Sequence, residues 1–337
     1  MNELIVLLKP RYLSFKNAVV VQDAGNRRVR YILFAGIGLA FWSGTFLAFF
    51  RVLTYFQSIE EFGDILAMKL LSMVLLTFFS LLVFSSVIVS LSKLYLSRDL
   101  LLVHSLPVSR GNVFFARWLE STVDSSWMVV LFSLPVFLSY GMVYHAGLLF
   151  YLTAALSFIP LCVTASAVSA LAVVISAVLL PAGRIRTVSV LFGLILILAL
   201  IFTFRLMRPE RLVNPETFST LLLYFREMST PGSPFLPTTW AFDSLSAALS
   251  GLMGKALFHT SLAWSCAISL GFITTWTAES LYFRGYAKAQ TTSERLFPHS
   301  RRAIRRRYGF ASRISGPAWA FAVKEFRTFF RDQTQWP

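Results

Sequence analysis

Charged residues and cysteines are both scarce in this chain, and each scarcity excludes a class of protein. Only 14% of the 337 residues are charged, whereas 56% are hydrophobic, which excludes an ordinary soluble globular domain. The two cysteines, Cys162 and Cys266, both lie inside apolar stretches. We therefore expect two free buried thiols, with neither a disulfide nor a metal site built on them. The composition indicates a polytopic membrane protein.

Patterns that would indicate catalysis or nucleotide binding are also missing. The phosphate-binding pattern G-x-x-x-x-G-K-[S/T] does not occur, and the nearest stretch, Gly251-Leu-Met-Gly254-Lys255, is too short. The four histidines are scattered and fit no metal spacing. The carboxylate pair Glu60-Glu61 lacks a histidine-bearing partner segment. From the residues alone we expect no catalytic residue, no bound cofactor and no metal site.

Six apolar runs are long enough to cross a bilayer as helices, which takes about 20 residues each. These runs cover residues 31–50, 70–92, 125–144, 146–183, 187–204 and 256–278. We interpret 146–183 as one long helix, bent at Pro160, because two spans there would put the arginine-rich C-terminal segment outside. The expected fold is all-α: a polytopic membrane helix bundle with six transmembrane helices.

Lysine and arginine outnumber acidic residues by 31 to 16, and their positions predict an orientation. Basic residues gather before the first run, between the second and third, between the fourth and fifth, and after the sixth. The intervening segments are richer in acidic residues, among them Glu60 and Glu61. Because basic loops stay inside, we expect a multi-pass protein of the cell inner (plasma) membrane with both termini in the cytoplasm.

The chain divides into three predicted regions: a cytoplasmic interfacial segment over 1–30, a transmembrane domain over 31–283 and a basic cytoplasmic segment over 284–337. For the first, an interfacial helix and a poorly ordered tail both remain open. The third ends in an amphipathic helix over 316–332, which we interpret as the lead-in to a second half. Its basic cluster predicts contact with anionic membrane lipid and not with nucleic acid, since no nucleic-acid-binding fold surrounds it. The cluster consists of Arg301, Arg302, Arg305, Arg306 and Arg307.

The segment between the fifth and sixth runs has helix signals of its own. Asn214-Pro215 is typical of a helix start, and residues 231–234 break the chain. A second short helix is predicted to begin after Thr238 or Thr239 and to stop at Gly251. We expect an external helical hairpin, with an interfacial loop anchored by Trp240 as the alternative.

Residues 97–120 form a charged interruption between the second and third runs, and we place the function there. Ser97 is a predicted N-cap, and Asp99 puts a negative charge in the first turn. Pro107 breaks the helix, and Ser109 is predicted to cap the next one. A short helix held between two spans would move both when pushed. The alternative is an ordinary loop at the headgroup zone.

The stretch from Asp99 to Arg110, D-L-L-L-V-H-S-L-P-V-S-R, resembles the coupling helix of ABC-2-type (type V exporter-like) ABC transporter permeases. The resemblance implies a permease subunit of an ATP-driven exporter, with a cytoplasmic coupling helix that docks on a separate ABC ATP-binding subunit. ATP binding and hydrolysis would belong to that partner, and a second permease half, fused or as a dimer, would complete the transporter. The implied coupling-helix residues are Ser97, Arg98, Asp99, Leu101, Leu102, His104, Ser105, Leu106, Pro107, Ser109 and Arg110.

Other classes of function fit the sequence less well. A secondary transporter, or another polytopic membrane protein without an ATPase partner, is the main alternative. Ion-coupled carriers usually keep ionisable groups within the bilayer, whereas here only Lys69 and His259 lie near the ends of runs. A membrane enzyme is a third hypothesis and has no catalytic constellation to support it.

Overall fold

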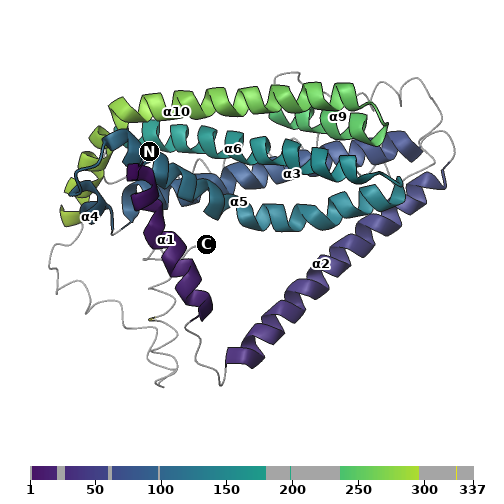
Figure 1. The fold of residues 1–337 in the computed structure, drawn as a ribbon, viewed down its shortest axis with the longest axis horizontal. Helices are drawn as coiled ribbons and strands as arrows, with labels where there is room; N and C mark the ends of the chain where they lie inside the picture. Colours follow the sequence, from purple (N-terminus) through teal and green to yellow (C-terminus); the bar gives the residue numbers. More distant parts are fainter. Residues whose placement is uncertain are drawn as a thin grey trace, which may run out of the picture.

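The computed structural model describes residues 2–20, 27–59, 63–97, 99–179, 198, 236–295 and 324. Every regular element in these ranges is a helix (Figure 1), which confirms the all-α fold. Five of the described helices are long and apolar enough to cross a membrane. Apart from residues 198 and 324, the predicted span over 187–204, the helix from Asn214, the cluster over 301–307 and the helix over 316–332 lie outside the described residues. The count of six spans therefore stays a prediction.

The central helix of the bundle is α6 (Leu148–Leu179), which contacts α3 (Gly63–Leu91), α5 (Arg110–Val143) and α10 (Met253–Arg295). It continues through Pro160, so the prediction of one long helix here is confirmed over its described length. Its small residues allow close approach of its neighbours. The fully buried members of this set are Ala165, Ser166, Ala167, Ser169 and Ala170.

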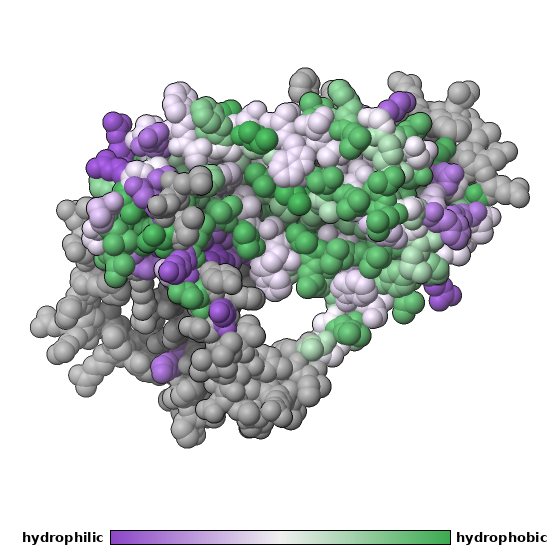
Figure 2. Space-filling view, viewed as in Figure 1, coloured by the Kyte–Doolittle hydropathy of each residue, from purple (hydrophilic) through white to green (hydrophobic). Residues whose placement is uncertain are grey.

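The first span, α2 (Arg27–Gln57), diverges from the bundle over its N-terminal half and packs against it over its C-terminal half (Figure 1), where the Phe41 ring contacts Phe132 of α5. There Leu53 is fully buried, and the Gln57 amide donates a hydrogen bond to the Val143 carbonyl at 2.9 Å. Further back, Leu39 is 69% exposed. Figure 2 shows hydrophobic residues over the middle of the bundle and hydrophilic ones toward its two ends, as lipid contact requires.

A tight turn joins α9 (Pro237–Leu249) to α10. Gly251 has a φ of 74°, a left-handed backbone that glycine adopts without strain, so the predicted stop is confirmed. The predicted short helix is also confirmed, although it begins slightly earlier, at Pro237. Ala241 and Leu245 are each only 1% exposed, so α9 packs into the bundle and is not an interfacial loop.

The core has two parts, one toward each end of the bundle. The first part surrounds Tyr140, Phe150 and Leu245 on the α9 side. The second surrounds Tyr95, Leu100 and Tyr282, beside the short helix α4 (Leu100–His104) and the N-terminal helix α1 (Asn2–Val20). Of the two alternatives for the N-terminus, the structure has the helix. We call these the α9 end and the α4 end.

Candidate functional site at the α4 end

A π-helical turn, η1 (Ser92–Leu96), follows α3 and leads into the site. Such turns break the regular backbone ladder and often occur at functional sites. Here the Tyr282 hydroxyl of α10 donates a hydrogen bond to the Leu94 carbonyl at 3.0 Å. The absence of a side chain at Gly285 lets α10 approach this turn closely. A Cβ at this position would lie only 3.1 Å from the Tyr95 hydroxyl oxygen and 3.0 Å from Ala177 Cβ. The exit of α3 is thus attached directly to α10.

The short helix α4 begins after Asp99, so the prediction of Ser97 as its N-cap is wrong. Ser97 still has an extended backbone, with ψ at 133°, and its hydroxyl donates to the Asp99 carboxylate. Leu100 is fully buried and anchors the helix, whereas Leu101 and Leu102 are 66% and 67% exposed. α4 therefore inserts one leucine into the bundle and presents two outward.

An ion pair connects the start of α4 to α5. The Arg117 guanidinium binds the Asp99 carboxylate with one nitrogen, and its other nitrogen lies 3.0 Å from Glu120 Oε2. Burial raises the pKa of Asp99, but hydrogen bonds from Ser97 and Arg117 outweigh burial, so the pKa is lowered overall. Arg117 and Glu120 are both buried. Asp99 thus remains ionised at neutral pH and holds α4 against α5.

Further charged residues extend this contact to α1 and η1. Arg11 of α1 pairs with Asp124 and donates to the Glu120 backbone carbonyl at 3.2 Å. The Lys93 ammonium lies 3.1 Å from Asp124 Oδ2. We call this set of three cations and three carboxylates the ionic network. It consists of Arg11, Lys93, Asp99, Arg117, Glu120 and Asp124.

The end of α4 is held by aromatic contacts. The His104 ring stacks on Tyr286, with ring centroids 4.3 Å apart and an interplanar angle of 8°. His104 Nδ1 lies 2.7 Å from the Leu100 carbonyl, so that nitrogen carries the proton and donates. His104 Nε2 is buried and has no hydrogen-bond partner among the described residues. The imidazole therefore attaches α4 to α10 mainly by stacking.

The break after α4 presents an exposed edge. The Ser105 hydroxyl donates to the Leu102 carbonyl at 2.7 Å, which closes the last turn. Leu106, 40% exposed, and Pro107 follow on the surface. Pro107 lies between α4 and α5, as predicted. The outward leucines of α4 and Leu106 thus belong to one short exposed segment.

The predicted N-cap of the next helix, Ser109, does begin α5, but its side chain makes no capping bond. Instead its backbone N–H donates to the Glu3 carboxylate at 3.4 Å, and the Asn112 amide donates to the same group at 2.9 Å. The bond from Asn112, followed by that from Ser109, lowers the pKa of Glu3. Arg110 lies 4.3 Å above the Phe283 ring, a cation–π contact with α10.

The structure thus divides the predicted coupling residues into two groups. Asp99, His104, Ser109 and Arg110 contact the rest of the bundle, as described above. Ser105 and the residues of the exposed segment face outward. Arg98 and Arg301, Arg302, Arg305, Arg306 and Arg307 lie outside the described residues.

Sequence reasoning missed the ionic network as a unit. Its signal was present, because Arg117, Glu120 and Asp124 are spaced i, i+3 and i+7 and so share one face of α5. The contribution of α1, through Glu3 and Arg11, carried no local signal. Among the described residues no group of three or more His, Cys, Asp or Glu is placed to hold a metal ion.

Neither the curated proteins nor the solved structures contain a match to this chain. A family model does match, over residues 23–337, and its description is Putative ATP-binding cassette. This finding overturns the resemblance to ABC-2-type permeases and the function inferred from it, a permease subunit that relies on a separate ATPase. The residues behind that resemblance are a helix start, a leucine run and a proline break, which any short helix between two spans needs. They identified a local structure and not a family.

The expectation that this chain is not an enzyme and that ATPase activity belongs to a partner subunit is also contradicted, since the matching family is described as a putative ATP-binding cassette. That expectation rested on a single missing motif, and the described residues likewise contain no strand that could precede a phosphate-binding loop. The match covers far more than half of the chain. The chain therefore belongs to the family described as Putative ATP-binding cassette.

Proposed function

We propose that this chain is a membrane-embedded component of an ABC transport system and that α4 with its exposed segment is the contact surface for another protein of that system. The family match and the five apolar helices support the general assignment. One observation supports the location: two adjacent leucines, Leu101 and Leu102, are about two-thirds exposed between two helices of membrane-spanning length.

Exposed leucines at a polar end of the molecule favour a protein partner. Burying a leucine side chain stabilises a contact by about 1.5–3 kcal/mol, so covering Leu101 and Leu102 would provide the apolar centre of a small interface. Leu106 would extend that centre. Asp99, with its lowered pKa, would retain its charge beside the interface at neutral pH.

The contacts around α4 would transmit force from such a partner into the bundle. Leu100 is fully buried, Asp99 is paired with Arg117 of α5, and His104 stacks on Tyr286 of α10. Upstream, the chain is continuous with η1 and α3. A displacement of α4 would therefore act on three long helices at once.

We assign the α4 end to the cytoplasm, where ATP is available. Arg11, Lys93 and Arg117 belong to this end, and loops rich in basic residues stay on the inner side of the cell membrane. In the same proposal the arginines of 301–307 contact anionic lipid. A second unit of the transporter, similar to this chain, would cover α2. Only 6% of the most apolar stretch of α2 is buried.

The test uses the full chain expressed in its own membranes, with paired charge substitutions. Leu101→Glu with Leu102→Glu should abolish co-purification of the other proteins of the transport system. Leu148→Glu with Leu149→Glu is the matched control. These adjacent leucines are also exposed, but they lie at the start of α6, at the α9 end of the bundle. Photolabelling with an azido analogue of ATP identifies the polypeptide that takes up nucleotide.

Two outcomes would contradict the proposal. One is equal recovery of the co-purified proteins with the α4 pair and with the control pair, at equal amounts of inserted chain. The other is the absence of any azido-ATP label from both the chain and its co-purified partners.

A further inference from the structure

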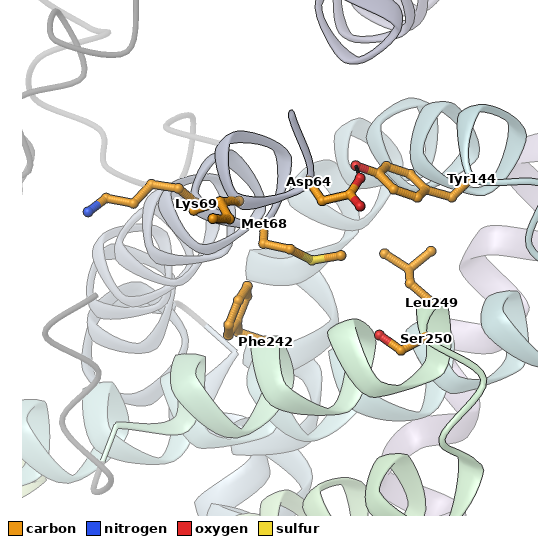
Figure 3. A pocket seen from close by; sticks show the side chains of 8 residues that line it. Asp64, Met68, Lys69, Tyr144, Phe242, Leu249 and Ser250 are labelled. Carbon is orange, nitrogen blue, oxygen red and sulfur yellow. Dashed lines mark hydrogen bonds between the residues drawn. The ribbon is translucent and has the colours of Figure 1, made fainter. Parts of the chain in front are cut away.

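A cavity of about 480 Å³ opens at the α9 end of the bundle (Figure 3). Its volume falls within the range of small-molecule sites, roughly 300–1,000 Å³. Three parts of the chain form it: the start of α3, the residue after α5, and α9 with its C-cap. The residues that line it are Asp64, Ile65, Met68, Lys69, Tyr144, Phe242, Leu249 and Ser250.

One side of the cavity carries a carboxylate held in a defined position. The Tyr144 hydroxyl donates to Asp64 Oδ1 at 3.2 Å, and Figure 3 shows the two groups directed toward each other. The Tyr144 ring in turn stacks on Tyr140 at an interplanar angle of 10°. Burial, and next the negative charge of Asp64, raise the pKa of Tyr144. Tyr144 therefore stays neutral and serves as a donor that orients the carboxylate.

This carboxylate is not neutralised by the described part of the chain. No lysine or arginine described by the structure lies within 4.0 Å of the Asp64 oxygens, and Oδ2 has no hydrogen-bond partner there. Lys69 contributes its stem to the lining, but Figure 3 shows its ammonium directed away from Asp64. The cavity thus has a negative side open to a ligand.

The facing walls are apolar and adaptable. Figure 3 shows Met68 reaching into the space between Asp64 and Phe242, with Leu249 on the far side. Methionine adjusts its shape to different ligands, and the face of Phe242 can attract a cation as well as an apolar group. These walls would reject a small hydrated ion, which needs polar ligands all round.

We propose that this cavity binds an amphipathic organic cation. The positive group would lie at Asp64 Oδ2, and the apolar body would fill the space between Met68, Phe242 and Leu249. An anion of the same shape would be repelled by Asp64. This site lies at the opposite end of the bundle from α4, so it goes beyond the proposed function and stands or fails separately from it.

The experiment measures binding of tetraphenylphosphonium to the full chain in nanodiscs of zwitterionic lipid, with protein-free nanodiscs subtracted. Tetraphenylborate, which has the same shape and the opposite charge, is the ligand control. We expect saturable binding of the cation and none of the anion. Asp64→Asn should weaken binding about tenfold, because the variant loses the Coulomb attraction between the carboxylate and the cation; a tenfold change corresponds to about 1.4 kcal/mol.

Asp243→Asn is the matched protein control, because Asp243 belongs to α9 but does not line the cavity. It should leave the affinity unchanged. A second pair tests the space itself: Ser250→Trp should block binding, whereas Ser250→Ala should not. Equal affinity in Asp64→Asn and the unmodified chain, or saturable binding of tetraphenylborate, would overturn the site.

Discussion

The two ends of the bundle differ in their charged contacts, although buried hydroxyl pairs such as Ser90 with Ser121 also occur near the α4 end. At the α4 end, long charged side chains and stacked rings connect separate elements, as in the pair of Asp99 with Arg117 and the stack of His104 on Tyr286. At the α9 end the contacts are short. The hydroxyls of Ser157, Ser244 and Thr260 form a buried triangle with sides of 2.9, 3.1 and 2.7 Å, which joins α6, α9 and α10.

This difference suggests different mechanical roles. Arginine and lysine side chains have many rotamers, and ordering them costs more entropy than ordering a serine or threonine, so their contacts rearrange more readily. Hydroxyls within hydrogen-bond distance hold helices at nearly fixed separation. We therefore expect the α9 end to behave as a rigid base and the α4 end as the part that responds to a partner.

The largest effect should come from breaking the ionic network at its buried centre. Arg117→Met leaves Glu120 buried with only Arg11 nearby, at 4.0 Å. Removing one member of a buried pair costs about 3–5 kcal/mol, so the free energy of unfolding, measured by denaturant titration in mild detergent, should fall by about 3 kcal/mol. Adding Glu120→Gln should recover most of this loss. An unchanged stability in Arg117→Met would mean that the network does not hold the α4 end.

A matched pair of leucine truncations compares the two ends directly. Leu100 and Leu245 are both essentially fully buried, one at each end, and Leu→Ala in a core costs about 2.7–5 kcal/mol. Leu245→Ala should lower the melting temperature of the whole bundle. Leu100→Ala should mainly release α4, seen as faster hydrogen exchange at residues 100–104 with a smaller change in melting temperature. The comparison would be wrong if the two variants lowered the melting temperature equally.

The smallest effect concerns pH. Because the folded-state pKa of Asp99 is lowered from its ordinary value of 3.8, its contribution is complete above that value and is lost as pH falls through the lowered pKa. The side chain is 52% exposed, so the contribution is about 1 kcal/mol or less. A spin label at Leu102→Cys, with Cys162 and Cys266 replaced, should become more mobile as the pH falls below 3.8.

Two controls accompany this titration. In Asp99→Asn the label should already be mobile at pH 5 and should change little on acidification. A label at Leu148→Cys, at the α9 end, should not respond. Mobility that falls as pH is lowered would have the wrong sign for a loss of the Asp99 pair.

Local signals predicted much of the helical framework. Gly251 was expected to stop a helix and does so with a positive φ, and Ser109 was expected to begin one and does. Such signals depend only on residues that are neighbours in the chain, so they can be recognised from the sequence alone. Ser97 failed as a cap because its hydroxyl is bound to Asp99, which is in turn paired with Arg117, a residue eighteen positions away.

The candidate site was predicted in outline only. Its leucines were expected as a contact surface, but sequence did not indicate that Leu100 would be buried while Leu101 and Leu102 stay exposed. In a five-residue helix without regular periodicity, the buried position depends on where α5 and α10 lie. The family assignment also failed, because the residues that carried it describe a turn between helices.

The sequence by itself determined that the chain is helical, where its described helices of membrane-spanning length lie, and that a short helix interrupts two of them, because hydropathy and capping are local properties. Only the tertiary structure decided which charges meet. Glu3 and Arg11 reach α5 across more than a hundred positions, and Asp64 and Tyr144 form one side of a cavity from eighty positions apart. Such pairs depend on how helices pack, and packing is decided by many weak contacts together.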